Sequence, residues 1–266
     1  MTSIFDNYDL PCSGCTNEPI DKIPLARIIH ILDQDYSKND LVAAERHLSY
    51  WMKEASALRD RRSELSLCNE MIGLCRRTND KTLAFTVIDR AVELIDVLSI
   101  TNTTSAGTVF LNAATTYKHF GEVEKALLFY QKTEILYAKL LPCNAYEYAA
   151  LYNNKAAVLE DLERYDEAEA LLQRALSILE ECDEYRIDKA ISYVNLARLV
   201  FSWNQDNELA DRYLDYAWEV LTDPGIAHDG MYAFVCAKAS DEFASLGRED
   251  EAFALAEVAK EIYEGT

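Results

Sequence analysis

Glycine and proline are scarce in this sequence of 266 residues, with 8 and 5 copies. Because these two residues interrupt helices and shape tight turns, their scarcity favours long uninterrupted helices. No stretch alternates apolar and polar residues for long enough to predict a sheet. The sequence therefore predicts an all-α fold.

Basic residues are also few, with 26 Lys and Arg against 46 Asp and Glu and a formal net charge of -20. This negative field repels phosphate backbones and anionic lipids, so we expect neither nucleic acid nor a membrane surface as a partner. No run approaches the ~18 apolar residues of a membrane span, and no signal peptide is recognisable. Seven cysteines spread over helical stretches suit a reducing compartment. We expect a soluble, cytoplasmic protein.

Catalytic motifs are absent as well. The sequence has no Gly-rich phosphate loop, no Gly-x-Ser-x-Gly elbow and no His-Glu-x-x-His pair. Its four histidines have no metal-ligand spacing, and its carboxylates are scattered as on solvated helix faces. We expect no enzymatic activity and no cofactor. An enzyme of an unrecognised type stays an alternative, which would require clustered ionisable groups in a closed pocket.

A repeated pattern of small residues organises the chain. Residues 152–181 hold two stretches with apolar residues at helical spacing, separated by a break at 163–166, which predicts a helical hairpin. The methyl side chain of Ala168 lets the two helix backbones approach closely where they cross. The same marker returns at steps of 40, 42, 42, 42 and 42 residues, as Ala44, Ala84, Ala126, Ala168, Ala210 and Ala252. A turn residue precedes most markers by about five places: Asn39, Asn79, Gly121, Glu163 and Gly247.

This spacing resembles the tetratricopeptide repeat (TPR), and the period of 42 with the opening Tyr152-Asn153-Asn154-Lys155-Ala156 resembles the kinesin-light-chain type. The resemblance covers roughly residues 24–264. The first and fifth repeats fit least well, the fifth because of an extra residue near 203–207. It implies an α-α superhelix of about six hairpins, at residues 25–58, 63–98, 104–141, 145–181, 186–221 and 230–263. We expect a single solenoid domain over residues 24–266, preceded by an extended arm over residues 1–23.

Asparagines recur on the predicted first helices. When the small residues Ala114, Ala156, Ala197 and Ser240 are numbered as position eight of their repeats, position six holds Asn112, Asn154 and Asn195, and Asn69 stands one place earlier in its repeat. In repeats of this resemblance, the first helix lines the concave groove. A primary amide offers a donor and an acceptor, so these side chains can pair with the backbone of an extended peptide. The alternative is that each asparagine bonds the backbone of a neighbouring repeat.

A modest line of cations lies near the same positions, at Arg76, Arg77, Lys118, Lys155 and Arg198. Such a line can receive acidic side chains or a C-terminal carboxylate of a ligand. In the alternative interpretation, cations such as Arg76 and Arg77 favour the negative end of a helix. We therefore predict a peptide site that includes Asn69, Asn112, Asn154, Asn195, Arg76, Lys118 and Arg198.

The predicted arm contains the pair Cys12 and Cys15, a spacing at which two thiolates can share a metal or form a redox couple. A structural zinc site needs four ligands, and no second pair of this kind is present. We therefore favour an incidental pair and predict no metal site, with a metal-sensitive or redox-sensitive adaptor as a lesser alternative.

These observations predict a non-catalytic scaffold that binds an extended peptide or protein segment in the groove. The alternative is a sensor or regulator that binds a short signalling peptide, as a resemblance to bacterial peptide-sensing repeat proteins implies. Residues 1–23 are too short for the DNA-binding effector that such proteins usually carry. The sequence leaves self-association and the identity of the partner open.

Overall fold

The computed structural model describes residues 21–180 and 185–265. These residues form twelve α-helices and no strand, so the predicted all-α fold class is confirmed. The helices are α1 (Leu25–Ser37), α2 (Leu41–Ala57), α3 (Arg61–Thr78), α4 (Lys81–Val97), α5 (Thr104–His119), α6 (Val123–Leu140), α7 (Glu147–Asp161), α8 (Tyr165–Glu180), α9 (Arg186–Asn204), α10 (Asn207–Leu221), α11 (Gly230–Ser245) and α12 (Glu249–Glu264). Cys12 and Cys15 lie outside the described residues, so the interpretations of that pair remain predictions.

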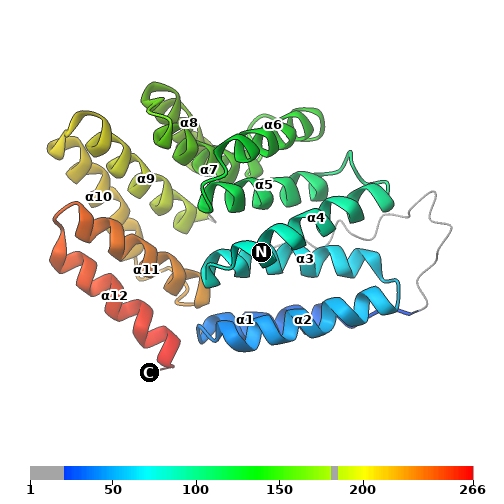
Figure 1. Ribbon diagram of the computed structural model, residues 1–266. Coiled ribbons are helices and arrows are strands. Elements are labelled where there is room, and N and C mark those ends of the chain that lie inside the picture. The colour runs from blue at the N-terminus through cyan, green and yellow to red at the C-terminus, as the bar shows by residue number, and fades with distance from the viewer. Residues whose placement is uncertain (1–20, 181–184, 266) are drawn as a thin grey trace. The chain divides into compact units, whose positions relative to one another are not determined.

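Consecutive helices pair as hairpins at the predicted places. Contacts join α3 to α4, α5 to α6, α7 to α8, α9 to α10 and α11 to α12. In the first hairpin, Nδ1 of His47 on α2 lies 2.7 Å from Oδ2 of Asp35 on α1. Figure 1 shows the two helices of a hairpin side by side, most clearly for α9 with α10 and α11 with α12. No helix of the described residues is long and apolar enough to cross a membrane.

The turns inside the hairpins have a common geometry. All five predicted turn residues adopt the left-handed conformation, with φ from 52° at Asn39 to 85° at Gly247. Gln205 has the same conformation, with φ at 52°, in the one hairpin for which the sequence named no turn residue. A left-handed residue ends a helix and reverses the chain within a few residues. Aspartates cap the N-termini of several second helices. The side chains of Asp40, Asp80 and Asp206 each accept a hydrogen bond from the backbone N–H of the residue three positions later.

The small residues that mark the repeat are buried where the helices cross. Ala44, Ala84, Ala126 and Ala168 are 0% exposed, and Ala210 and Ala252 are 3% and 5% exposed. A larger side chain at these positions would force the two helices of a hairpin apart. On the first helices, position eight is buried at Ala114, Ala156 and Ala197, whereas Ser240 at this position of the last repeat is partly exposed and its neighbour Ala239 is buried.

Contacts within the chain gather into two compact units. Unit 1 holds α1 to α6 and unit 2 holds α7 to α12, with residues 37–39 grouped with unit 2. The single solenoid domain over residues 24–266 therefore stays a prediction. In unit 1 the core is rich in aromatic rings, such as Phe110 beside Phe129 and Phe85 beside Tyr117. Gly107 is required there, because a Cβ at this position would lie 2.5 Å from the Tyr137 ring.

First helices lie on one side of each unit. Contacts join α3 to α5 in unit 1, and α7 to α9 and α9 to α11 in unit 2, whereas the second helices of neighbouring hairpins approach one another less. Closer packing in one layer than in the other makes the closer layer the inner side of a stack of hairpins. The predicted site residues all lie on first helices, so each lies in this layer of its own unit.

Candidate functional site

Four asparagines on first helices form two hydrogen-bonded pairs. In unit 1, Nδ2 of Asn112 donates to Oδ1 of Asn69 at 2.8 Å, which links α5 to α3. In unit 2, Nδ2 of Asn195 donates to Oδ1 of Asn153 at 3.0 Å, which links α9 to α7. The side chains therefore do bond a neighbouring repeat, but they bond its side chain rather than its backbone.

The two pairs follow one rule of position. In each pair the donor occupies position six of its repeat and the acceptor occupies position five of the repeat before it. This diagonal contact explains why Asn69 stands one place earlier than the position-six asparagines. It also identifies Asn153 as a member of the array, which position counting on the sequence misses.

Asn154 has a different local role. Its Nδ2 donates to the carbonyl oxygen of Ala150, one turn earlier on the same helix, at 2.9 Å. The partner of Asn195 is thus Asn153 and not Asn154. Asn153 is further held by Ser192, whose Oγ accepts from Nδ2 at 2.8 Å. The period contains the signal for this pairing, because Asn153 and Asn195 are 42 residues apart in the sequence.

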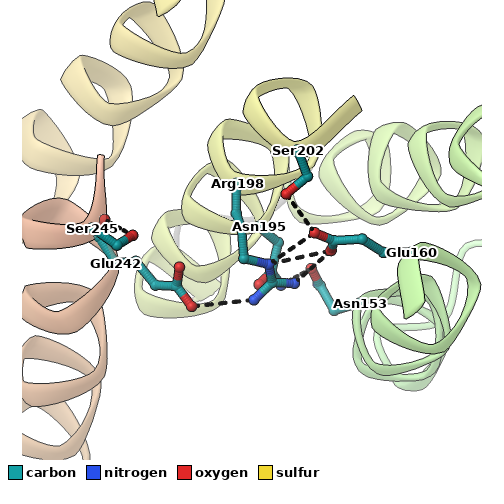
Figure 2. Close-up of polar contacts among 7 residues, drawn as sticks. All are labelled: Asn153, Glu160, Asn195, Arg198, Ser202, Glu242 and Ser245. Carbon is teal, nitrogen blue, oxygen red and sulfur yellow. Dashed lines mark hydrogen bonds and ion pairs between the residues drawn. The ribbon is translucent and has the colours of Figure 1, made fainter. Parts of the chain in front are cut away.

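Arg198 on α9 bridges the hairpins before and after its own. Its Nη2 lies 3.0 Å from Oε2 of Glu160 on α7, and its Nη1 lies 3.2 Å from Oε1 of Glu242 on α11. Figure 2 shows the guanidinium between the two carboxylates, with Ser202 on the Glu160 side. Burial opposes the charge on Arg198, but the charges and hydrogen bonds of Glu160 and Glu242 outweigh it and raise its pKa.

Arg76 on α3 has neutral partners instead. Its Nη1 donates to Oγ1 of Thr116 at 2.8 Å and to the carbonyl oxygen of Asn112 at 3.3 Å. Burial lowers the pKa of this guanidinium. Within the described part of the chain Arg76 forms no ion pair. The third predicted cation, Lys118, lies in the last turn of α5 and is partly exposed.

A small cleft opens between α9 and α11 in unit 2. It has a volume of about 240 Å³ and a mostly apolar lining that includes Val194, Phe234 and Val235. Asn195 and Arg198 line it from α9, and Lys238 and Glu242 line it from α11. The structure thus brings two of the seven predicted site residues to one cleft, whereas Asn69, Asn112, Arg76 and Lys118 belong to unit 1. Lys238, Glu160 and Glu242 were not predicted.

Two carboxyl groups in unit 1 are perturbed by their surroundings. Burial and the charge of Asp33 raise the pKa of Glu70 to about 7, although Arg76 acts in the opposite direction. Burial likewise raises the pKa of Asp33 on α1, against the opposing effect of His30. Glu70 lies next to Asn69 on α3, so this titratable group borders the asparagine pair of unit 1.

The described residues include three buried cysteine thiols, Cys68, Cys75 and Cys236. No group of three or more His, Cys, Asp or Glu side chains is placed to hold a metal ion in residues 21–180 and 185–265. Burial raises the pKa of the Cys68 and Cys75 thiols to about 12 and that of Cys236 to about 11. Such thiols stay protonated near neutral pH and are poor nucleophiles.

Comparison with known proteins finds a repeat family that matches part of the chain. The sequence profile of the tetratricopeptide repeat matches residues 147–215, which span α7 to most of α10. A search of curated proteins found no match.

Solved structures resemble the fold over most of the chain. BtubC (BKLC) from P. vanneervenii is 18% identical with a TM-score of 0.50, and the match covers 92% of each chain. A protein from P. anserina, described as a putative kinesin light chain with nearly identical TPR-like repeats, is 16% identical with a TM-score of 0.51. A variant of that protein with one substitution is 16% identical with a TM-score of 0.53, and both matches cover 76% of this chain and 95% of the other.

Proposed function

We propose that this chain, in which residues 147–215 match the tetratricopeptide repeat, is a non-catalytic scaffold that binds an extended protein segment along its first helices. The fold is typical of protein-interaction scaffolds in general. The choice of the first-helix layer and of an extended segment comes from the asparagine pairs, which are the observation that carries the proposal.

Spare hydrogen-bonding capacity in the pairs supports this proposal. A primary amide has two N–H donors and an oxygen that accepts two hydrogen bonds. The side chains of Asn112 and Asn195 each use one donor in the described structure, and their oxygens accept from no described group. Each pair therefore fixes the side chain of its donor, Asn112 or Asn195, and leaves one N–H and the oxygen of that amide available to a ligand. A peptide backbone offers the complementary C=O and N–H whatever its side chains are.

The surroundings of the pairs support a protein ligand over other classes. The net charge of -20 opposes phosphate backbones and anionic membrane surfaces. Cys68, Cys75, Cys143 and Cys236 are free thiols, which supports a cytoplasmic or otherwise reducing location. Apolar surface beside fixed polar groups, as in the α9/α11 cleft, suits a segment that carries side chains of both kinds.

Affinity capture with matched variants tests the proposal. The bait proteins are the parent, an Asn112→Ala/Asn195→Ala variant, and a control variant, Gln131→Ala/Glu219→Ala, that changes exposed residues on the second helices α6 and α10. All three are checked for intact folding by circular dichroism and thermal melting before use. We expect partners in the lysate of the source organism to be retained by the parent and the control and lost by the asparagine variant.

Two other results would count against the proposal. Partners retained equally by all three baits would move the binding surface away from the first helices. Partners lost only by the control variant would assign it to the second helices. Asn154→Ala provides a further check, because its side chain lies outside both pairs and its loss should leave binding unchanged.

A further inference from the structure

The asparagine array stops at α9. The position rule that joins Asn153 to Asn195 would next join position five of α9 to position six of α11, and these positions hold Val194 and Lys238. Valine offers no hydrogen bond to a lysine ammonium, so no side-chain bridge forms at this level. The cleft lies at this point of the array, and both Val194 and Lys238 line it.

The walls of the cleft are mainly aliphatic. Matching positions on the two helices face the same space: Ala190, Ile191 and Val194 on α9, and Phe234, Val235 and Ala239 on α11. Leu221 contributes from α10. At about 240 Å³ the cleft is smaller than the roughly 300–1,000 Å³ typical of sites for drug-sized ligands. Its size therefore suits one side chain of a larger ligand better than a separate small molecule.

Two polar groups on the cleft lining are available to a ligand. The exposed ammonium of Lys238 has no ion pair within the described part of the chain, and Oδ1 of Asn195 accepts no hydrogen bond there. The remaining polar pair, Arg198 and Glu242, is already joined at 3.2 Å. A ligand in the cleft thus meets an apolar surface, the side-chain amide of Asn195 and the solvent-exposed positive charge of Lys238.

We propose that the α9/α11 cleft holds one aliphatic side chain of the bound segment, with a single carboxylate beside that side chain in contact with Lys238 and a backbone N–H donated to Asn195. This inference rests on the proposed function and adds the side-chain preference that the asparagine pairs lack. The complementary charge of Lys238 selects the acidic neighbour, and the apolar lining, in which Ile191 and Phe234 are partly exposed, selects the aliphatic residue.

The charges around the cleft favour a ligand segment with one carboxylate over a segment with several consecutive acidic residues. Glu160 and Glu242 together exceed the single charge of Arg198 between them. The chain as a whole carries a net charge of -20. A strongly acidic segment would therefore be repelled on approach, whereas one carboxylate can be placed at Lys238 with little repulsion.

Selection from a displayed library of random peptides, each about a dozen residues long, tests the inference with the full chain as bait. We expect the parent to enrich peptides in which Leu, Ile or Val adjoins a single Asp or Glu. Lys238→Glu should keep the aliphatic preference and exchange the acidic neighbour for Lys or Arg, with a change in enrichment of roughly threefold or more, as suits a partly solvated charge pair. Lys139→Glu makes the same charge change on an exposed position of α6 and should alter neither preference.

A second variant tests the apolar part. Val194→Asn/Lys238→Asn restores asparagines at positions five and six and should replace the cleft by a side-chain bridge, which removes the aliphatic preference. A parent motif that survives both variants unchanged would overturn the cleft inference and leave the proposed function standing. A parent that enriches no motif would overturn the proposed function as well. A preference for basic residues in the parent would overturn the inference on its own. If Val194→Asn/Lys238→Asn does not fold, Lys238→Glu still tests the inference, because Lys238 is exposed and its substitution should leave the fold intact.

Discussion

The α7/α9 and α9/α11 intervals share one helix and one fold but differ in what fills them. Between α7 and α9, Asn153 and Asn195 form a hydrogen bond at the centre of the interval. Between α9 and α11, the corresponding Val194 and Lys238 form none, and a cleft of about 240 Å³ opens. Both intervals lie between the first helices of neighbouring hairpins. The comparison teaches that the residues at positions five and six decide whether the two first helices are joined there by an amide hydrogen bond.

Arg198 belongs to both intervals and limits how far they can differ. It holds Glu160 across one interval and Glu242 across the other, so three consecutive hairpins of unit 2 are fixed by one side chain. Its ion pair with Glu242 therefore joins the two helices that line the cleft. A preorganised opening costs a ligand less ordering on binding than a flexible one.

The largest effect should come from overpacking the crossing of α7 and α8, which contacts α9 as well. Ala168 is fully buried in a cluster with Leu159 of α7 and Leu196 of α9. Ala168→Leu adds three carbon atoms there, and we expect a loss of about 3 kcal/mol in the free energy of unfolding. Ala256→Leu, on an exposed position of α12, should leave stability within about 0.5 kcal/mol. Chemical denaturation measures both, and equal stability of the two variants would contradict the assigned crossing.

Removing Arg198, which forms ion pairs with both Glu160 and Glu242, should have the next largest effect on stability. Arg198→Ala leaves Glu160 and Glu242 without their cation in partly buried positions, and we expect a loss of about 2 kcal/mol, between the values for exposed and for buried pairs. Arg164→Ala removes an exposed ion pair within the hairpin of α7 and α8 and should not move the melting temperature. If the two variants melt alike, the bridge does not hold the intervals together.

Loss of the asparagine bond should cost less and should separate Asn153 from Asn154. Asn195→Ala removes the donor to a partly buried oxygen of Asn153, for which we expect about 1 to 2 kcal/mol. Asn154→Ala removes the bond to Ala150 of the same helix and keeps the Asn153–Asn195 pair, so we expect the smaller loss of the two. Thermal melts of both variants are the measurement. A larger loss of stability in Asn154→Ala than in Asn195→Ala would contradict the assignment of the inter-repeat bond to Asn153 and Asn195.

The smallest expected effect is a pH dependence of stability in unit 1, and it comes from Glu70. The folded protein holds a proton on Glu70 up to about pH 7, whereas the unfolded chain loses it near the ordinary value of 4.5. Stability from this group is therefore present at low pH and is lost as pH rises through that window. Asp33, Tyr36 and Arg76 are the charged or titratable groups that act on or face Glu70.

Glu70→Gln stays neutral at every pH and removes this dependence. Because Glu70 is partly exposed, solvent screens part of the effect. Relative to the parent, we expect the variant to gain about 1 kcal/mol in the free energy of unfolding between about pH 5 and pH 8. Denaturant titrations at the two pH values measure the difference. A constant offset between the two proteins would show that Glu70 titrates normally in the folded state. Asp188→Asn in unit 2 offers no substitute control, because the carboxyl of Asp188 also has a raised pKa through its own burial.

By itself the sequence determined the repeat. A period near 42, a buried alanine at each crossing and a turn residue five places before it are local and periodic requirements, so they can be read without knowing what lies across the chain. Asn79 and Glu163, for example, were predicted as turns and adopt the left-handed conformation. The predicted polar site was less complete, because hydrogen bonds between repeats depend on how neighbouring helices are offset.

Only the tertiary structure decided which side chains meet. Asn154 shares its repeat position with Asn112 and Asn195, yet Asn153 forms the bond, because adjacent first helices are offset by one residue and bring position five opposite position six. The same offset places Val194 beside Lys238 and Arg198 beside Glu242. A period fixes which residues are equivalent, but the contact between equivalent helices is set by the angle and shift of their packing, and these depend on every buried side chain between them.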